Sequence, residues 1–118
     1  MKNYAKINLS DEPRVELHDA LGLTGAEISV NCLPAGAGVP FVHSHKQNEE
    51  IYGILSGRGT AELDGEPVAL SEGDWLRVGP AVKRRFSAAA DCGMSFLCIQ
   101  VKEHSLEGFT AGDAIVEN

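Results

Sequence analysis

The sequence has few basic residues, and this shortage excludes several classes of partner. Ten Lys and Arg stand against 17 Asp and Glu, which gives a formal net charge of -7 at pH 7. Binding to a phosphate backbone depends on a basic surface, so we expect no nucleic-acid partner. The same balance argues against an anionic membrane surface. No apolar run approaches the roughly 18 residues of a membrane-spanning helix, so we expect no membrane segment.

Cysteine is also scarce. The chain has three, Cys32, Cys92 and Cys98, and no C-x-x-C pair. An odd number leaves at least one thiol without a disulfide partner. The first residues lack the apolar stretch of a secretory signal peptide. These features predict a cytoplasmic protein with reduced thiols.

A long helical stripe of apolar residues is missing as well. Residues 16–23 form the one weak candidate for a short helix. Thirteen glycines and five prolines divide the chain into short segments instead. Strands are expected at 27–33, 39–45, 50–55, 60–63, 66–70, 75–78, 84–88 and 94–101, with a turn at 57–59 and a hairpin turn at Asp64-Gly65. Many short strands with frequent turns predict an all-β antiparallel barrel or sandwich, here a single domain over 1–118.

Two of the four histidines stand as His43-Ser44-His45. Residues i and i+2 of an extended segment point to the same side, so both imidazoles face one direction. A hairpin after His45 would set the carboxylate of Glu50 against them. Two histidines and one carboxylate on one face can hold a divalent metal such as Fe, Mn, Ni or Zn. We therefore predict a metal site at His43, His45 and Glu50.

The spacing of these residues resembles the first motif of the cupin superfamily, G-x5-H-x-H-x(3,4)-E-x6-G. Glu50 has the required distance both from His45 and to Gly57, whereas Gly38 is one residue short of the expected lead-in. The resemblance covers about residues 27–101 and leaves 103–118 as a tail. It implies an antiparallel β-barrel, or jelly roll, of the cupin type, and small cupins are commonly homodimers.

The second cupin motif, G-x5-P-x-G-x2-H-x3-N, is matched less well. The segment from Gly73 resembles it in its Gly-Asp opening and in Pro80. Arg84 stands where cupins place a histidine that binds metal, and a guanidinium cannot ligate. Three arrangements follow. The metal binds through the other three residues, Arg84 pairs with Glu50 and replaces the metal, or Arg84 reaches the pocket mouth and binds an anionic ligand.

The leading functional hypothesis is a small-molecule protein with a divalent metal in its barrel and Arg84 at the rim, steering an anionic carboxylate or sugar-like ligand. Tyr52 and Gln100 join Arg84 as candidate ligand-binding residues. Similar proteins carry out isomerisation and dioxygenation, and turnover itself is left open. The alternative is a metal-free ligand-binding or sensing module in which Arg84 pairs with Glu50. A third reading is acid–base chemistry with His43 or His45 as the base.

The strand at 94–101 is apolar on both faces, which gives a physical motive for a homodimer, since each face needs a cover. Trp75 and Arg77 share a face of another strand, and that face lies either in the pocket or at a subunit contact. Alternation directs Glu49 away from Glu50, towards solvent.

Overall fold

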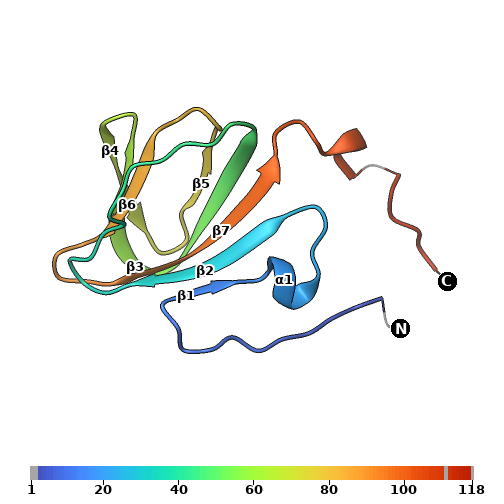
Figure 1. Ribbon diagram of the computed structural model, residues 1–118, viewed down its shortest axis with the longest axis horizontal. Helices are drawn as coiled ribbons and strands as arrows, with labels where there is room; N and C mark the ends of the chain where they lie inside the picture. Colours follow the sequence, from blue (N-terminus) through green and yellow to red (C-terminus); the bar gives the residue numbers. More distant parts are fainter. Residues whose placement is uncertain (1–2, 111, 118) are drawn as a thin grey trace.

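The longest strand, β3 (Asn48–Leu63), connects both walls of the fold. The computed structural model describes residues 3–110 and 112–117. The first half of β3 pairs with β7 (Met94–Lys102) on one side and β5 (Trp75–Val78) on the other. Its second half pairs with β4 (Glu66–Ser71) and β6 (Arg84–Ala88). One strand thus passes from one wall of the barrel into the other (Figure 1).

Two further strands extend the wall that contains β7. Strand β2 (Glu27–Leu33) pairs with β7, and β1 (Arg14–Glu16) pairs with β2. Helical structure is limited to the single turns α1 (His18–Leu21) and η1 (Glu107–Thr110) among the described residues. All strand pairs are antiparallel, so the predicted all-β fold is confirmed. No described helix has the length and apolar character needed to cross a membrane.

The predicted strands 27–33, 75–78 and 84–88 agree with the structure, whereas two other expectations are wrong. Residues 57–59 form no turn, because β3 bends at a register shift between Ile54 and Ser56 and continues. Residues 39–45 form no strand; His43 makes a single bridge to Arg84, and Gly38, just before the segment, makes another to Ser87. The hairpin turn after β3 is as expected, with Asp64 and Gly65 at φ 50° and 85°.

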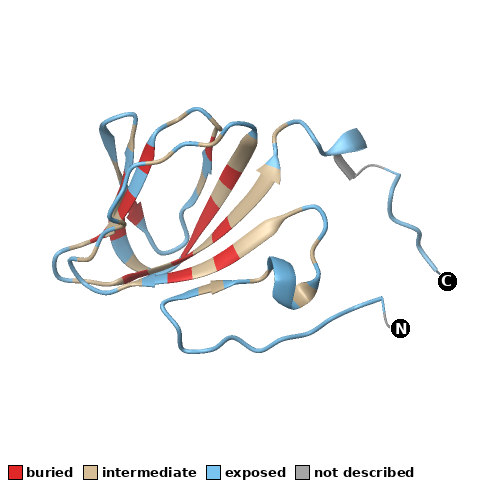
Figure 2. Cartoon of the chain, viewed as in Figure 1, coloured by how far each residue is buried: buried red, intermediate tan, exposed pale blue. Residues whose placement is uncertain are grey.

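Strand β2 turns its polar face inward. Ser29 and Asn31 are buried, while Ile28 and Val30 are half-buried and Cys32 is exposed (Figure 2). A strand of a simple sheet normally buries its apolar face. The inversion shows that the barrel interior is a polar chamber on this side.

Aromatic residues close the floor of that chamber. The rings of Tyr52 and Phe86 lie 4.2 Å apart, and those of Phe86 and Phe96 lie 5.5 Å apart. Such pairs contribute about 0.5–1.5 kcal/mol each beyond the burial of their surface. They belong to a core that also includes Ile54, Ala61, Leu70, Val78, Ala88 and Met94. This packing gives the polar side chains above it a rigid base.

Candidate metal and ligand site

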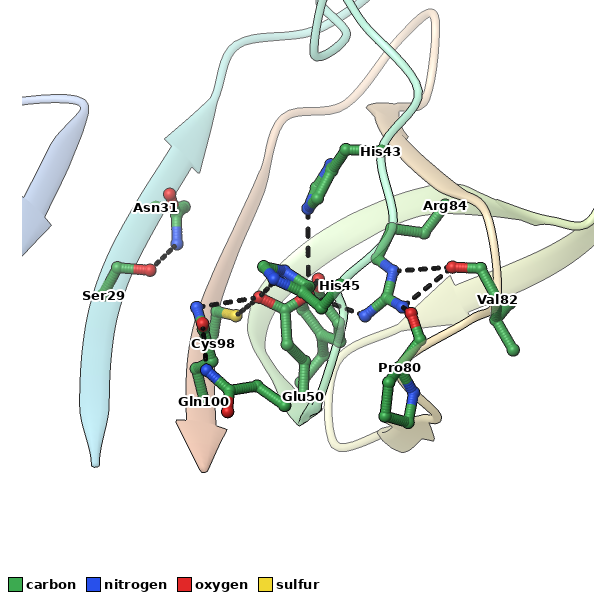
Figure 3. A network of polar contacts seen from close by, with 12 residues as sticks. Ser29, Asn31, His43, His45, Glu50, Pro80, Val82, Arg84, Cys98 and Gln100 are labelled. Carbon is green, nitrogen blue, oxygen red and sulfur yellow. Dashed lines mark hydrogen bonds and ion pairs between the residues drawn. The ribbon is translucent and has the colours of Figure 1, made fainter. Parts of the chain in front are cut away.

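The histidines lie on an irregular segment that crosses the barrel mouth before β3. Backbone hydrogen bonds fix this segment: the amide of His43 donates to the Arg84 carbonyl at 3.1 Å, and the amide of Arg84 donates back at 2.9 Å. The amide of His45 donates to the carbonyl of Pro80 at 2.8 Å. These bonds hold both imidazoles beside Glu50, which β3 supplies (Figure 3).

The three side chains form a compact group of metal-ligating atoms. One donor atom from each of His43, His45 and Glu50 lies within 4.8 Å of the others. His45 Nε2 is 3.2 Å from Glu50 Oε2, and His43 Nε2 is 3.9 Å from Glu50 Oε1. Although His45 Nε2 is close to the carboxylate, the two groups are not oriented for a hydrogen bond. This buried nitrogen has no hydrogen-bond partner among the described residues. A buried ring nitrogen without a hydrogen bond is a candidate metal ligand.

Glu50 is the centre of the hydrogen-bond network. Its Oε1 accepts from the Tyr52 hydroxyl and from Arg84 Nη1, the latter at 2.9 Å. Its Oε2 accepts long contacts from Cys98 Sγ at 3.3 Å and Gln100 Nε2 at 3.4 Å. Burial by itself raises the pKa of Glu50, but hydrogen bonds from Tyr52, Cys98 and Arg84 and the nearby His45 lower it below its usual value. The carboxylate is therefore ionised at neutral pH.

Arg84 lies beneath this carboxylate, so its expected place at the pocket rim is wrong. Its side chain is 0% exposed. Nε donates to the Val82 carbonyl at 3.1 Å, and Nη2 donates to the carbonyls of Gly79, Pro80 and Val82 at 2.7–3.0 Å. The loop between β5 and β6 thus wraps the guanidinium, and the remaining nitrogen faces Glu50.

The two oxygens of Glu50 have different environments. Oε1 accepts hydrogen bonds from the Tyr52 hydroxyl and the Arg84 guanidinium, whereas Oε2 accepts weaker ones from Cys98 and Gln100 and faces His45. Two ligands at 2.0–2.2 Å from one ion are roughly 2.8–4.2 Å apart. The 3.2 Å between His45 Nε2 and Oε2 lies within that range, and so does the 3.9 Å between His43 Nε2 and Oε1. The two histidines and the Glu50 carboxylate therefore lie close enough together to hold a divalent ion beside the Arg84 pair.

The protonation states of the surrounding side chains also favour a metal at this position. Burial lowers the pKa of His43 despite the opposing Glu50 carboxylate, so its ring is neutral at neutral pH, the form that ligates metal. Burial and the Glu50 charge raise the pKa of Cys98 to about 12 and keep the thiol protonated. Burial likewise raises the pKa of Tyr52, which remains a hydrogen-bond donor.

A cavity of about 520 Å³ opens above the cluster. The sequence-predicted residues Tyr52 and Gln100 line it, as do His43, His45 and Glu50, whereas Arg84 does not. Among the lining residues that the sequence did not predict are Arg14, Ser29 and Asn31. Polar residues alternating with apolar ones in 27–33 were the available signal for the last two, and no local pattern marked Arg14.

Trp75 and Arg77 lie on the outer face of the sheet. Arg77 donates to Glu49 at 2.6 Å and to Glu103 at 2.9 Å. Trp75 is 62% exposed, and its ring covers Gly53. Neither residue lines the cavity, so of the two places that the sequence left open, a subunit contact stays a prediction.

Comparisons with known proteins agree with this architecture. The chain is 64% identical to a cupin protein of known crystal structure from Bacteroides fragilis, with full coverage of both chains and a TM-score of 0.96. A predicted oxalate decarboxylase from Thermotoga maritima is 25% identical, with 64% of each chain covered and a TM-score of 0.60. An uncharacterised protein from Methanocaldococcus jannaschii is 32% identical over 66 residues, which are 56% of this chain.

The chain spans about half the length of this archaeal relative, since the match covers 53% of it. The family model described as a cupin domain matches residues 29–100, more than half of the chain and the whole region that carries the cluster. The chain therefore belongs to the cupin family.

Proposed function

We propose that this cupin binds a small anionic molecule in its barrel, next to a divalent metal held by His43, His45 and Glu50. The observation that carries the proposal is the convergence of three ligating side chains, two of which, His43 and His45, have a buried ring nitrogen without a hydrogen bond. When bound, the metal would supply Lewis acidity or oxygen activation to a ligand oxygen, as isomerases and dioxygenases require. The chain's own residues orient Glu50 and line the cavity.

A carboxylate is the ligand class that we favour. The Thermotoga maritima protein, described as a predicted oxalate decarboxylase, is a relative whose name implies such a substrate. Tyr52 and Gln100 reach the cavity and contact Glu50, so they hold the carboxylate ligand of the metal in place and present polar edges to a substrate.

Metal analysis tests the proposal. Untagged protein, prepared without chelator, is compared with His45→Ala and with the control His104→Ala, which changes an exposed histidine. We expect near-stoichiometric metal in the native protein and in the control, and its loss in His45→Ala with an unchanged circular dichroism spectrum. Metal that persists in His45→Ala contradicts the proposed site.

A second candidate function, a metal-free binding module, is favoured by the buried Arg84–Glu50 pair. A guanidinium at 2.9 Å already neutralises the carboxylate, and its charge disfavours a dication nearby. This alternative predicts no metal in the native protein and new metal affinity in Arg84→His. The same elemental analysis therefore separates the two functions.

We also propose that the protein is a cytoplasmic homodimer. The outer face of β2, β7 and β3 carries apolar side chains in register, with Ile28, Ile99 and Ile51 side by side. These residues are only half-buried. A second copy of the chain would cover this face. The cytoplasmic location rests on a different observation, the three free cysteines, which suit a reducing compartment.

A further inference from the structure

The wall of the cavity formed by β1 and β2 carries polar side chains that neither the core nor the metal cluster uses. Ser29 and Asn31 are 3% and 8% exposed and point inward. Asn31 Nδ2 donates to Ser29 Oγ at 3.0 Å, and Arg14 Nη1 donates to Asn31 Oδ1 at 2.7 Å (Figure 3 shows the first of these bonds). Even a hydrogen-bonded polar pair stabilises an interior no more than apolar side chains of the same shape would, so an inward polar row on a strand points to a ligand.

Arg14 supplies the charge of this wall. Among the described residues that line the cavity, it is the only one with a fixed positive charge. Its bond to Asn31 holds one end of the guanidinium at the cavity, and Nε contacts Glu16 at 3.3 Å in an exposed pair. Such an exposed pair is screened by solvent and binds weakly.

The donors of this wall match a carboxylate. The fork of Arg14 can give two parallel hydrogen bonds to it. The hydroxyl of Ser29 accepts from Asn31, and in the described part of the chain no acceptor engages its hydrogen. A single guanidinium balances one negative charge. The carboxylate of Glu27, which also lines the cavity, would repel a second one. A singly charged carboxylate is therefore favoured over a phosphate dianion.

We propose that Arg14, Asn31 and Ser29 form a carboxylate-recognition subsite, so that the pocket takes a small hydroxy or keto acid whose second oxygen faces His43, His45 and Glu50. This proposal rests on the proposed function, because it treats that cluster as the other end of the binding site. Strand β7 separates β2 from β3. The distance from β2 to β3 is therefore two strand spacings, or about 10 Å, and the hydrogen bond or metal contact at each end of the ligand takes up about 2–3 Å of it. The ligand therefore has about four or five carbons.

The test uses 4-hydroxybutanoate as the probe and butane-1,4-diol as its neutral counterpart, in which a hydroxyl group replaces the carboxylate. Binding is measured by amide chemical-shift titration of the full chain, alongside inorganic phosphate. Arg14→Gln removes the charge, Arg14→Lys keeps it without the fork, and Arg58→Gln is the control, an exposed arginine paired with Asp91 at 3.0 Å.

We expect Arg14→Gln to weaken 4-hydroxybutanoate binding about tenfold or more, since it removes charged hydrogen bonds to the carboxylate. Arg14→Lys should recover part of the loss. Affinity for the diol should not change, nor should Arg58→Gln change any affinity. Equal binding of 4-hydroxybutanoate to the native protein and to Arg14→Gln overturns the proposal. So do tighter binding of phosphate and the absence of saturable 4-hydroxybutanoate binding to the native protein.

The design separates this proposal from the proposed function. If His45→Ala loses metal while Arg14→Gln leaves 4-hydroxybutanoate binding unchanged, the metal site stands and the subsite falls. If the native protein carries no metal but Arg14→Gln still weakens the probe, the subsite stands without the metal. Thermal unfolding of each variant shows whether it retains the native fold, which we expect because Arg14 is exposed.

Discussion

Arg84 has a structural role at a position where a metal-binding histidine is expected. It occupies the position where the cupin resemblance leads us to expect a metal-binding histidine, and it carries a permanent charge in the protein interior. That charge is compensated by Glu50 and by carbonyls of the 79–82 loop. The residue therefore fixes both the loop and the carboxylate that faces the histidines.

The stability of the protein should depend strongly on this residue. Arg84→Met leaves the buried Glu50 carboxylate without its cation and three carbonyls without their donor. Removing one member of a buried pair typically destabilises by about 3–5 kcal/mol. Urea unfolding followed by circular dichroism measures the change. Arg85→Met, at the exposed neighbouring position, should change the free energy of unfolding by less than about 1 kcal/mol. Equal effects of the two substitutions would contradict the structural role of Arg84.

At the scale of the elements, strand β3 depends on its glycines. Gly57 has φ 80°, in the left-handed region, and lies against the chain that leads into β7. A Cβ at this position would be 1.8 Å from the carbonyl oxygen of Gly93. The sequence motif that ends in Gly57 therefore serves the bend of β3, and this bend carries the strand from one wall of the barrel into the other.

Gly57→Ala should consequently destabilise the fold by at least about 2 kcal/mol, from backbone strain together with the clash. Gly25→Ala is the matched control, because nothing lies within 4 Å of its added Cβ and its φ is ordinary. We expect the control to stay within about 0.5 kcal/mol of the native protein. Denaturant midpoints for the three proteins make the comparison. A Gly57→Ala midpoint equal to that of the control would show that β3 adapts without strain.

At the scale of the whole molecule, the barrel has two unlike faces. Its interior is lined by polar side chains above an aromatic floor, and the outer face of the same strands is apolar and incompletely covered. The row of Ile28, Ile99 and Ile51 continues through Val30 and Leu97, which also pair across the strands. The charged pair of Arg77 and Glu49 borders it. This pattern of an apolar centre with a charged rim is typical of a protein interface.

A homodimer is the expected consequence. Light scattering after gel filtration should give twice the chain mass of 12.6 kDa. Ile99→Glu places a charge in the centre of the apolar row and should yield a monomer, whereas Ala69→Glu, at an exposed position of β4, should remain a dimer. A native protein with the mass of a single chain would contradict the proposed interface.

The sequence alone predicted what depends on local patterns. Alternation located β2, the glycine and proline breaks delimited β5 and β6, and the Asp64-Gly65 pair located a hairpin, because strand period and turn conformation are properties of neighbouring residues. The spacing of His43, His45 and Glu50 predicted a group that the structure brings together. The strand pattern predicted an all-β barrel or sandwich, and the cupin resemblance narrowed this to the cupin type, because Gly38 and Gly57 of the first motif flank the same three residues.

The tertiary structure decided everything that depends on which face of a strand points inward. Closure of the barrel buries the polar face of β2, places Arg84 beneath Glu50, and brings Arg14 to the cavity from a strand that sequence patterns did not reveal. Asn31 lies 17 positions after Arg14, and Arg84 lies 34 positions after Glu50. Contacts over such separations follow from how the strands pair in space, because a local pattern carries no information about the partner across the barrel.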